Sequence, residues 1–358
     1  MNGYARFMAA LRREEPDAVP VWELLINSPV IERLRPGASY ADFAEWMDLD
    51  GVTCGEDWKS EPVDDGGIKD EWGIVWRVAE PGVTYPCGGP IETEEDLDSI
   101  EPPDPEAPWR LKTLESLVKR FKGERAIVFL GHDSFEFSHY LVGGMVNLFK
   151  LYVKNPRFAK RISQMVLEYK IMVMERAARS GADVLLTGDD YANKTGPLMS
   201  PAQLREFVLP YMAKAVETSH RLGLPFIKHT DGNIWRIVDM LVDSGIDGLD
   251  PLEPVARMDI GEVKRAYGDR ICVVGNVDCS HLLQFGTVED VTEAVKETIA
   301  KGSPGGGHIL ASSNSIHPGV NPDNYVAMVR AARKYGKYPI DRELIREYAG
   351  RDYAANLR

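Results

Sequence analysis

Short apolar runs recur along the chain, and each ends in a cluster of polar residues that precedes a helical pattern. The later runs are AIVFLG (126–131), DVLLTG (183–188), PFIKHT (225–230), DGLDPL (247–252), ICVVGN (271–276) and HILASS (308–313). Two earlier runs are VPVWELL (19–25) and DGVTCG (50–55). Buried strands that alternate with helices form a parallel sheet, and eight of them predict a closed (β/α)8 TIM barrel. A doubly wound open sheet is the alternative.

The helical patterns between these runs begin with recognisable capping signals. Ser200 precedes Pro201 and is followed three residues later by Gln203, which predicts a capping box. Asn155 and Asn321 also stand directly before a proline, so we expect each of them to cap a helix.

Two segments fall outside this alternation. The first twenty residues predict a short amphipathic helical extension ahead of the barrel. Residues 60–108 are rich in proline, glycine and acidic residues, and within them GIVWRVA (73–79) and GVTYP (82–86) predict a hairpin. We expect the rest of this insertion to be irregular and to belong to a single domain that spans residues 1–358.

Polar residues concentrate after the apolar runs, where the active-site loops of a barrel lie. These clusters are GEDW (55–58), GHDSFEFSH (131–139), GDDYANK (188–194), HTDGN (229–233), DPLEP (250–254), NVDCSH (276–281) and SSNSIH (312–317). A barrel with a purely structural role does not need so many histidines and carboxylates at one end, and the pattern therefore indicates an enzyme.

Charge and cysteine content narrow the class of protein further. The chain has 42 Lys and Arg against 55 Asp and Glu, for a net charge of −13. This balance argues against nucleic acid or an anionic membrane surface as a partner. Four scattered cysteines, the lack of an apolar signal-peptide core and the lack of an 18-residue apolar stretch predict a soluble cytoplasmic protein.

His229 and Asp231 are the strongest candidates for metal ligands. They lie at positions i and i+2 after an apolar run, so on a strand both side chains point the same way. Imidazole and carboxylate together suit a divalent metal, although Asp231 could instead cap a helix beside a packed histidine. Glu253, between two prolines, and His317 are further candidates; a salt bridge and a surface-loop position are their simpler explanations.

Asp189 and Asp190 form a pair of adjacent carboxylates in another of these loops. Two close carboxylates can share a proton, which raises the pKa of one of them and suits acid catalysis. Because adjacent residues on a strand diverge, we expect one side chain to point inward and the other to stabilise the loop.

Several longer motifs resemble the uroporphyrinogen decarboxylase (URO-D) superfamily, whose fold is a (β/α)8 barrel. The similar segments are GHDSFEFSHYLVGGM (131–145), LMSPAQLREFVLPYMAKAV (198–216), GNVDCSHLL (275–283) and GGHILASSNSIHPGVNPDNYVAMVRAARKYG (306–336). The RQAGRY motif that grips the porphyrinogen carboxylates in true decarboxylases is missing from the corresponding region, 20–37. The resemblance therefore favours the branch of corrinoid-dependent methyltransferases over true uroporphyrinogen decarboxylase.

Relatives that methylate coenzyme M bind zinc through a His-x-Cys pair and a distant Cys. In this chain His229 matches the histidine, Asp231 replaces the first cysteine, and Asn314 falls near the second. The resemblance thus implies a zinc site with oxygen in place of sulfur, which points away from thiol substrates. Family members are often dimers, so a homodimer is compatible with the resemblance, and the sequence leaves the oligomeric state open.

The resulting hypothesis is a zinc-dependent substrate:corrinoid methyltransferase that demethylates a small donor such as an aryl methyl ether. The methyl group would pass to a cobalt(I) corrinoid on a partner protein, because the chain has no Asp-x-His-x-x-Gly corrinoid-binding motif. Candidate proton donors are Asp189, Asp190 and Tyr191. Candidate substrate-binding residues are Glu56, Asp57, His132, Tyr140, Asn276 and Asn314. The alternatives are a metal-free decarboxylase or lyase of a small carboxylic acid and a binding protein that has lost catalysis.

Overall fold

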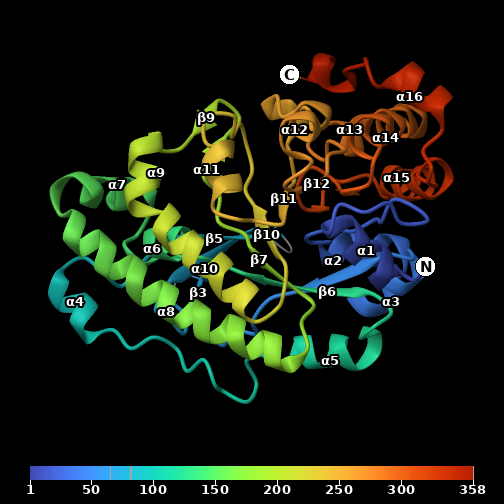
Figure 1. Cartoon of the computed structure of the whole chain (residues 1–358). Helices are drawn as coiled ribbons and strands as arrows, with labels where there is room; N and C mark the ends of the chain where they lie inside the picture. The colour runs from blue at the N-terminus through green and yellow to red at the C-terminus, as the bar shows by residue number, and fades with distance from the viewer. Residues whose placement is uncertain (65, 81–82, 358) are drawn as a thin grey trace.

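A curled parallel sheet forms the centre of the computed structural model, which describes residues 1–64, 66–80 and 83–357. Figure 1 shows the sheet surrounded by helices. In spatial order its strands are β1 (Gly51–Cys54), β6 (Ala126–Gly131), β7 (Val184–Thr187), β10 (Phe226–His229), β11 (Gly248–Asp250), β12 (Cys272–Val274) and β13 (His308–Ile309). All neighbouring pairs are parallel, which confirms the TIM-barrel-like α/β fold.

The apolar run at 19–25 was expected as the first strand. It lies between β13 and β1 but forms only isolated backbone contacts with the residues beside them. The amide of Trp22 donates to the carbonyl of Leu310, and the amide of Leu310 donates to the carbonyl of Pro20. On the other side, the amide of Asp50 donates to the carbonyl of Val21. The segment therefore occupies the position of the eighth strand and joins the two edges of the sheet, with too few ladder bonds to form a regular strand.

Strand alternation separates the barrel interior from the layer under the helices. Val128, Leu186 and Ile227 belong to an inner cluster, whereas Phe129, Leu185 and Phe226 pack in the cluster that includes the helices. Helix α1 (Gly3–Leu11), the expected N-terminal helix, adds its own apolar residues to the inner cluster. A Cβ on Gly51, the first residue of β1, would lie 2.9 Å from Trp22 and 3.1 Å from Phe7, so α1 closes the end of the barrel where the strands begin.

Helices follow most strands, and the three proposed caps are confirmed. The side chains of Ser200, Asn155 and Asn321 each accept a hydrogen bond from the first turn of their helix. The helices after α1 are α2 (Ser28–Leu34), α3 (Tyr40–Trp46), α4 (Glu94–Ser99), α5 (Lys112–Phe121), α6 (Phe135–Leu141), α7 (Met145–Lys154), α8 (Pro156–Ser180), α9 (Pro201–Phe207), α10 (Leu209–Arg221), α11 (Val238–Asp243), α12 (Ile260–Tyr267), α13 (Leu282–Phe285), α14 (Val288–Gly302), α15 (Pro322–Tyr335) and α16 (Arg342–Tyr348), with short 3₁₀ turns η1 (Pro254–Ala256) and η2 (Tyr353–Leu357).

The first helices of the chain pack against elements from its last part. Helix α15 contacts α2, and α1 contacts β13, as the neighbouring blue and red segments in Figure 1 show. Among the described residues, no helix is both long enough and apolar enough to cross a membrane.

The insertion at 60–108 is more regular than expected. It contains an antiparallel sheet of β2 (Ser60–Pro62), β3 (Ile68–Asp70), β4 (Val75–Glu80) and β5 (Val83–Gly88). The pairing of β4 with β5 confirms the hairpin, whose turn at 81–82 lies outside the described residues. Strands β2 and β3 were missed because both are short, β2 is exposed and β3 is half-buried, so neither carries a hydrophobic alternation. A third sheet is the small hairpin of β8 (Ala192–Asn193) and β9 (Gly196–Pro197).

Candidate active site

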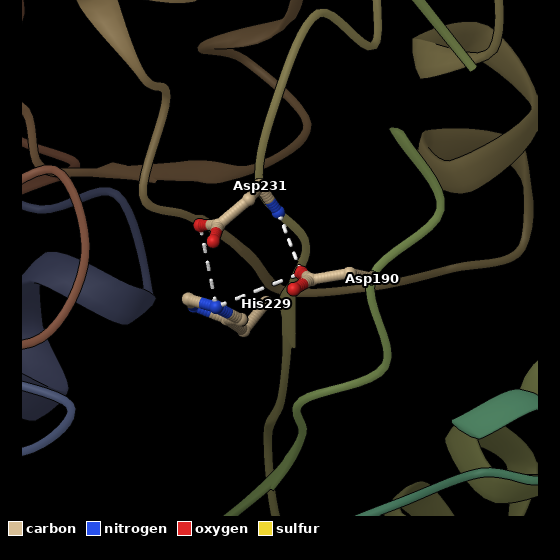
Figure 2. Close-up of side chains that lie close together, drawn as sticks. All are labelled: Asp190, His229 and Asp231. Carbon is tan, nitrogen blue, oxygen red and sulfur yellow. Dashed lines mark hydrogen bonds and ion pairs between the residues drawn. The ribbon is translucent and has the colours of Figure 1, made fainter. Parts of the chain in front are cut away.

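Three side chains from the ends of two neighbouring strands converge at the barrel mouth. Asp190 follows β7, while His229 ends β10 and Asp231 lies two residues further on; Figure 2 shows both carboxylates directed toward the imidazole. The Nε2 atom of His229 lies 3.5 Å from Oδ1 of Asp231 and 3.9 Å from Oδ1 of Asp190. One ligand atom of each residue lies within 4.8 Å of the other two, which is close enough for a shared metal ion.

The sharp turn after β10 brings Asp231 into this position. Gly232 has φ +82°, and a Cβ there would lie 2.5 Å from the carbonyl oxygen of Asn193, so the close approach requires glycine. The amide of Gly232 donates to Oε2 of Glu253 at 3.0 Å, and the amide of Asp231 donates to Oδ1 of Asp190 at 2.8 Å. Glu253 therefore supports the backbone of this turn.

His229 is oriented by a buried carboxylate. Its Nδ1 lies 2.5 Å from Oδ2 of Asp250, at the end of the adjacent strand β11, which leaves Nε2 facing Asp190 and Asp231. Metal-binding histidines commonly have this arrangement, in which a carboxylate fixes the ring and its tautomer. Burial opposes a charge on the imidazole, but the hydrogen bond with Asp250 and the nearby carboxylates outweigh it and raise the pKa of His229 to about 9.

Asp231 contains a buried oxygen atom without a partner. Its Oδ2 accepts a hydrogen bond from Nδ2 of Asn314, while Oδ1 is buried and makes no hydrogen bond with any described residue. Burial and the neighbouring Asp190 carboxylate raise the pKa of Asp231 well above its ordinary value. Zinc ligands bound at about 2.0–2.1 Å in a tetrahedral shell lie roughly 3.3 Å apart, close to the observed spacing of Nε2 and Oδ1. The donor set therefore fits a divalent metal with nitrogen and oxygen ligands.

The other two residues expected to bind metal lie outside this group. Glu253 contacts the backbone of Gly232, as described above. Nε2 of His317 lies 3.1 Å from the carbonyl of Cys279, and its Nδ1 accepts from the amide of Gly319 at 3.1 Å, so both ring nitrogens are engaged in the loop. Among the described residues, the group close enough for a shared ion contains Asp190, which the sequence had suggested only as a proton donor, and neither Glu253 nor His317.

Asp189 and Asp190 diverge as expected from strand geometry. Asp189 is fully buried and accepts hydrogen bonds from the amides of Asp133 and Glu136, so it stabilises the loop between β6 and α6. Burial opposes its charge, but His132 and Lys228 lower the pKa of Asp189 well below its ordinary value. A carboxylate of this kind stays ionised at neutral pH, which does not suit the role of proton donor.

Tyr191 belongs to a buried polar cluster in the layer behind the barrel. Its hydroxyl donates to Oδ2 of Asp133, and Nζ of Lys228 lies 4.0 Å from the centre of its ring. Burial and the charge of Asp133 raise the pKa of Tyr191 well above its ordinary value. This environment gives Tyr191 a structural role. The sequence did not predict the pairing of Asp133 with Lys228, because nothing in its pattern links the two positions.

A cavity of about 350 Å³ lies between the barrel mouth and the β2–β5 sheet, beside the group formed by Asp190, His229 and Asp231. Three expected substrate-binding residues, Glu56, His132 and Tyr140, line it. Glu136, which was not anticipated, also lines it and accepts a hydrogen bond from the amide of Asp190 at 3.3 Å. Burial and the charges of Asp189 and Asp190, opposed by that of His132, raise the pKa of Glu136 to about 7.

The remaining candidates make structural contacts. Asp57 accepts hydrogen bonds from the amide and hydroxyl of Thr113 at the start of α5, at 2.9 and 2.5 Å. The side-chain amide of Asn276 donates to the carbonyls of Leu252 and Met258. Neither residue lines the cavity, whereas Asn314 contributes through its bond to Asp231.

Comparison with known proteins agrees with this fold. Residues 80–335 match the model of the family "Uroporphyrinogen decarboxylase (URO-D)". The uroporphyrinogen decarboxylase of Thioalkalivibrio sulfidiphilus is 23% identical over 356 residues, covering 92% of this chain and 97% of that protein. That of Colwellia psychrerythraea is 26% identical over 263 residues, or 69% of this chain and 70% of that protein.

A solved structure described as a methyltransferase from Methanosarcina mazei superposes with a TM-score of 0.76 at 19% identity, covering 94% of this chain and 99% of that one. The fold and site thus define a TIM-barrel-like protein of an enzyme family. This chain belongs to the URO-D family.

We predict that Lys228→Met strongly destabilises the protein, because it leaves Asp133 as an unpaired charge in a buried site. Nζ of Lys228 lies 3.4 Å from Oδ2 of Asp133, and both side chains are fully buried. Loss of one partner of such a pair costs about 3–5 kcal/mol. Urea unfolding should show this loss, and the double variant Lys228→Met/Asp133→Asn should be more stable than Lys228→Met alone. Equal stability of the two variants would show that the pair is not ionised.

Proposed function

We propose that this protein transfers a methyl group from a small methyl donor, such as an aryl methyl ether, to a cobalt(I) corrinoid on a partner protein. In this proposal a zinc ion is held by His229, Asp231 and Asp190. The observation that carries it is the orphaned Oδ1 of Asp231, which lies 3.5 Å from the free Nε2 of a histidine whose other nitrogen is held by Asp250. When bound, zinc would act as a Lewis acid on the donor oxygen.

The surrounding residues prepare this site. Asp250 fixes the imidazole of His229, and Asn314 holds the second oxygen of Asp231, so Nε2 of His229 and Oδ1 of Asp231 face each other across the group. The amide of Asp231 also restrains Asp190. These contacts lower the rearrangement needed for metal binding, as is typical of preorganised sites.

The reaction balances as the donor ether plus cobalt(I) corrinoid and a proton, giving an alcohol and methylcobalt corrinoid. The C–O bond of the donor breaks, its electron pair stays on oxygen, and the proton is taken up there. Glu136 lines the neighbouring cavity and contacts the backbone of Asp190, so it is better placed than Asp189 or Tyr191 to deliver a proton.

The family assignment and the fold shared with the M. mazei methyltransferase support methyl transfer as the reaction class. Decarboxylation of a carboxylate-rich tetrapyrrole fits the site less well. The cavity of about 350 Å³ is at the lower end of the roughly 300–1,000 Å³ typical of small-molecule sites. Among the described residues that line it there is no lysine or arginine to bind the carboxylates of such a substrate.

We predict that the purified protein binds one zinc ion per chain, measured by elemental analysis after dialysis. His229→Ala should lose the metal, since it removes the only nitrogen ligand of the group. Asp250→Asn, which weakens the orienting contact, should lower zinc affinity about 10–100-fold. His220→Ala changes an exposed histidine on α10 and serves as the control that retains zinc. Wild-type protein that remains metal-free and instead binds small carboxylic acids would favour the lyase alternative.

We also predict methyl transfer to free cob(I)alamin, followed by the absorbance change of the cobalamin. The donor panel should include methoxylated aromatics and methylamines. His229→Ala should reduce the rate by at least about 10²-fold, the usual contribution of one acid or Lewis-acid contact. Absence of transfer from every donor with zinc-loaded protein would contradict the proposed reaction.

A further inference from the structure

The cavity beside Asp190, His229 and Asp231 has aromatic walls. Trp58 stacks on Phe137 with ring centres 5.7 Å apart and planes at 18°. Tyr140 meets Trp76 edge-to-face at 5.2 Å, and it also contacts Phe137. All four rings line the same cavity, which therefore offers aromatic faces and edges to a ligand.

Aromatic walls can bind either a cation or another ring, and the surrounding charges favour a ring. The buried Nζ of Lys170 lies 3.6 Å from the centre of Phe137 and 4.8 Å from that of Trp58. The guanidinium of Arg110 lies 5.6 Å from Trp58. Two of the rings already interact with cations of the protein itself, and a further cation would be repelled.

The acidic residues of the cavity are likewise engaged. Glu56 accepts hydrogen bonds from Lys170 at 2.6 Å and from the hydroxyl of Tyr169 at 2.7 Å. Asp70 accepts from the indole of Trp76 at 2.7 Å and from the amides of Trp72 and Ile74. These carboxylates stabilise the wall, so little negative charge is left to attract a cationic ligand.

His132 supplies a polar group for the ligand. Its Nδ1 faces Glu136 and Asp189 at 3.4 and 3.5 Å, and its side chain is 24% exposed at the cavity. Nδ1 is buried and makes no hydrogen bond with the described residues. Their hydrogen bonds do not involve Nε2 either, so we take Nε2 as the ring nitrogen that meets a ligand. A phenolic hydroxyl can either accept from or donate to an imidazole nitrogen, so this pairing does not depend on the protonation state of the histidine.

We infer that the cavity binds a single uncharged aromatic ring, stacked against its aromatic walls, with a hydroxyl group hydrogen-bonded to Nε2 of His132. Glu136, which lines the cavity, contacts the amide of Asp190, so the cavity lies next to the group of Asp190, His229 and Asp231. In this inference, a methoxy group on the bound ring points toward that group. This inference rests on the proposed function and deepens it, because it names methoxylated phenols as the donor class.

Equilibrium binding to the full chain, without corrinoid, tests the inference through tryptophan fluorescence or calorimetry. 2-Methoxyphenol should bind at least about tenfold more tightly than methoxycyclohexane and than tetramethylammonium, which probe the need for a ring and for a cation. These comparisons on the wild-type protein need no variant. Tighter binding of tetramethylammonium, or equal binding of the saturated ether, would overturn the inference.

Two variants locate the bound ring. Trp76→Leu should weaken binding of 2-methoxyphenol about tenfold, whereas Trp46→Leu, on the exposed face of α3, should leave it unchanged. His132→Gln should reduce the preference for 2-methoxyphenol over methoxybenzene, which lacks the hydroxyl. Unchanged affinity and preference in the folded variants would place the ring elsewhere and contradict the inference.

The outcomes separate this inference from the proposed function. Ring binding without methyl transfer to cob(I)alamin would overturn the proposed reaction and leave the ring site in place. Methyl transfer from a non-aromatic donor, with no binding of 2-methoxyphenol, would overturn the ring site alone.

Discussion

The hydrogen bond between His229 and Asp250 is the contact on which the organisation of the barrel mouth depends. It joins the ends of two adjacent strands, β10 and β11, whose register places the two residues directly side by side. Because Nδ1 is held on this side, Nε2 is turned toward Asp190 and Asp231. The sheet register thus determines which atom of the histidine faces the site.

Charge balance distinguishes Asp190 and Asp231 from the carboxylates that are buried elsewhere in the barrel. Glu56 is paired with Lys170, Asp133 with Lys228, and Asp189 lies near His132. Asp190 and Asp231, in contrast, share only His229, which is already bonded to Asp250. The side chains of Asp190 and Asp231 are 37% and 22% exposed, so both are only partly buried, and a bound divalent cation would offset the repulsion between them. The cluster therefore has the electrostatic character of a metal site.

Much of this arrangement could be predicted from the sequence. The apolar runs located the strands, and the spacing of His229 and Asp231 placed both side chains at one strand end. Asp250 and the pairing of Asp190 with His229 were not foreseen, since contacts between strands depend on register, which periodicity does not specify. The local contacts of His317 were not foreseen for a related reason: the loop after β13 brings both of its ring nitrogens against neighbouring backbone groups. Strands β2 and β3 of the four-stranded sheet were not predicted because both are short and lack a hydrophobic alternation.

The most direct test of the metal site is X-ray absorption spectroscopy of the zinc-loaded protein. One imidazole nitrogen and carboxylate oxygens at about 2.0–2.1 Å are expected, with no sulfur at about 2.3 Å. Sulfur is a meaningful alternative because the buried thiol of Cys279 is close enough for the charge of Asp231 to affect it. A clear zinc–sulfur distance, or zinc without any imidazole ligand, would contradict a site built from His229, Asp190 and Asp231.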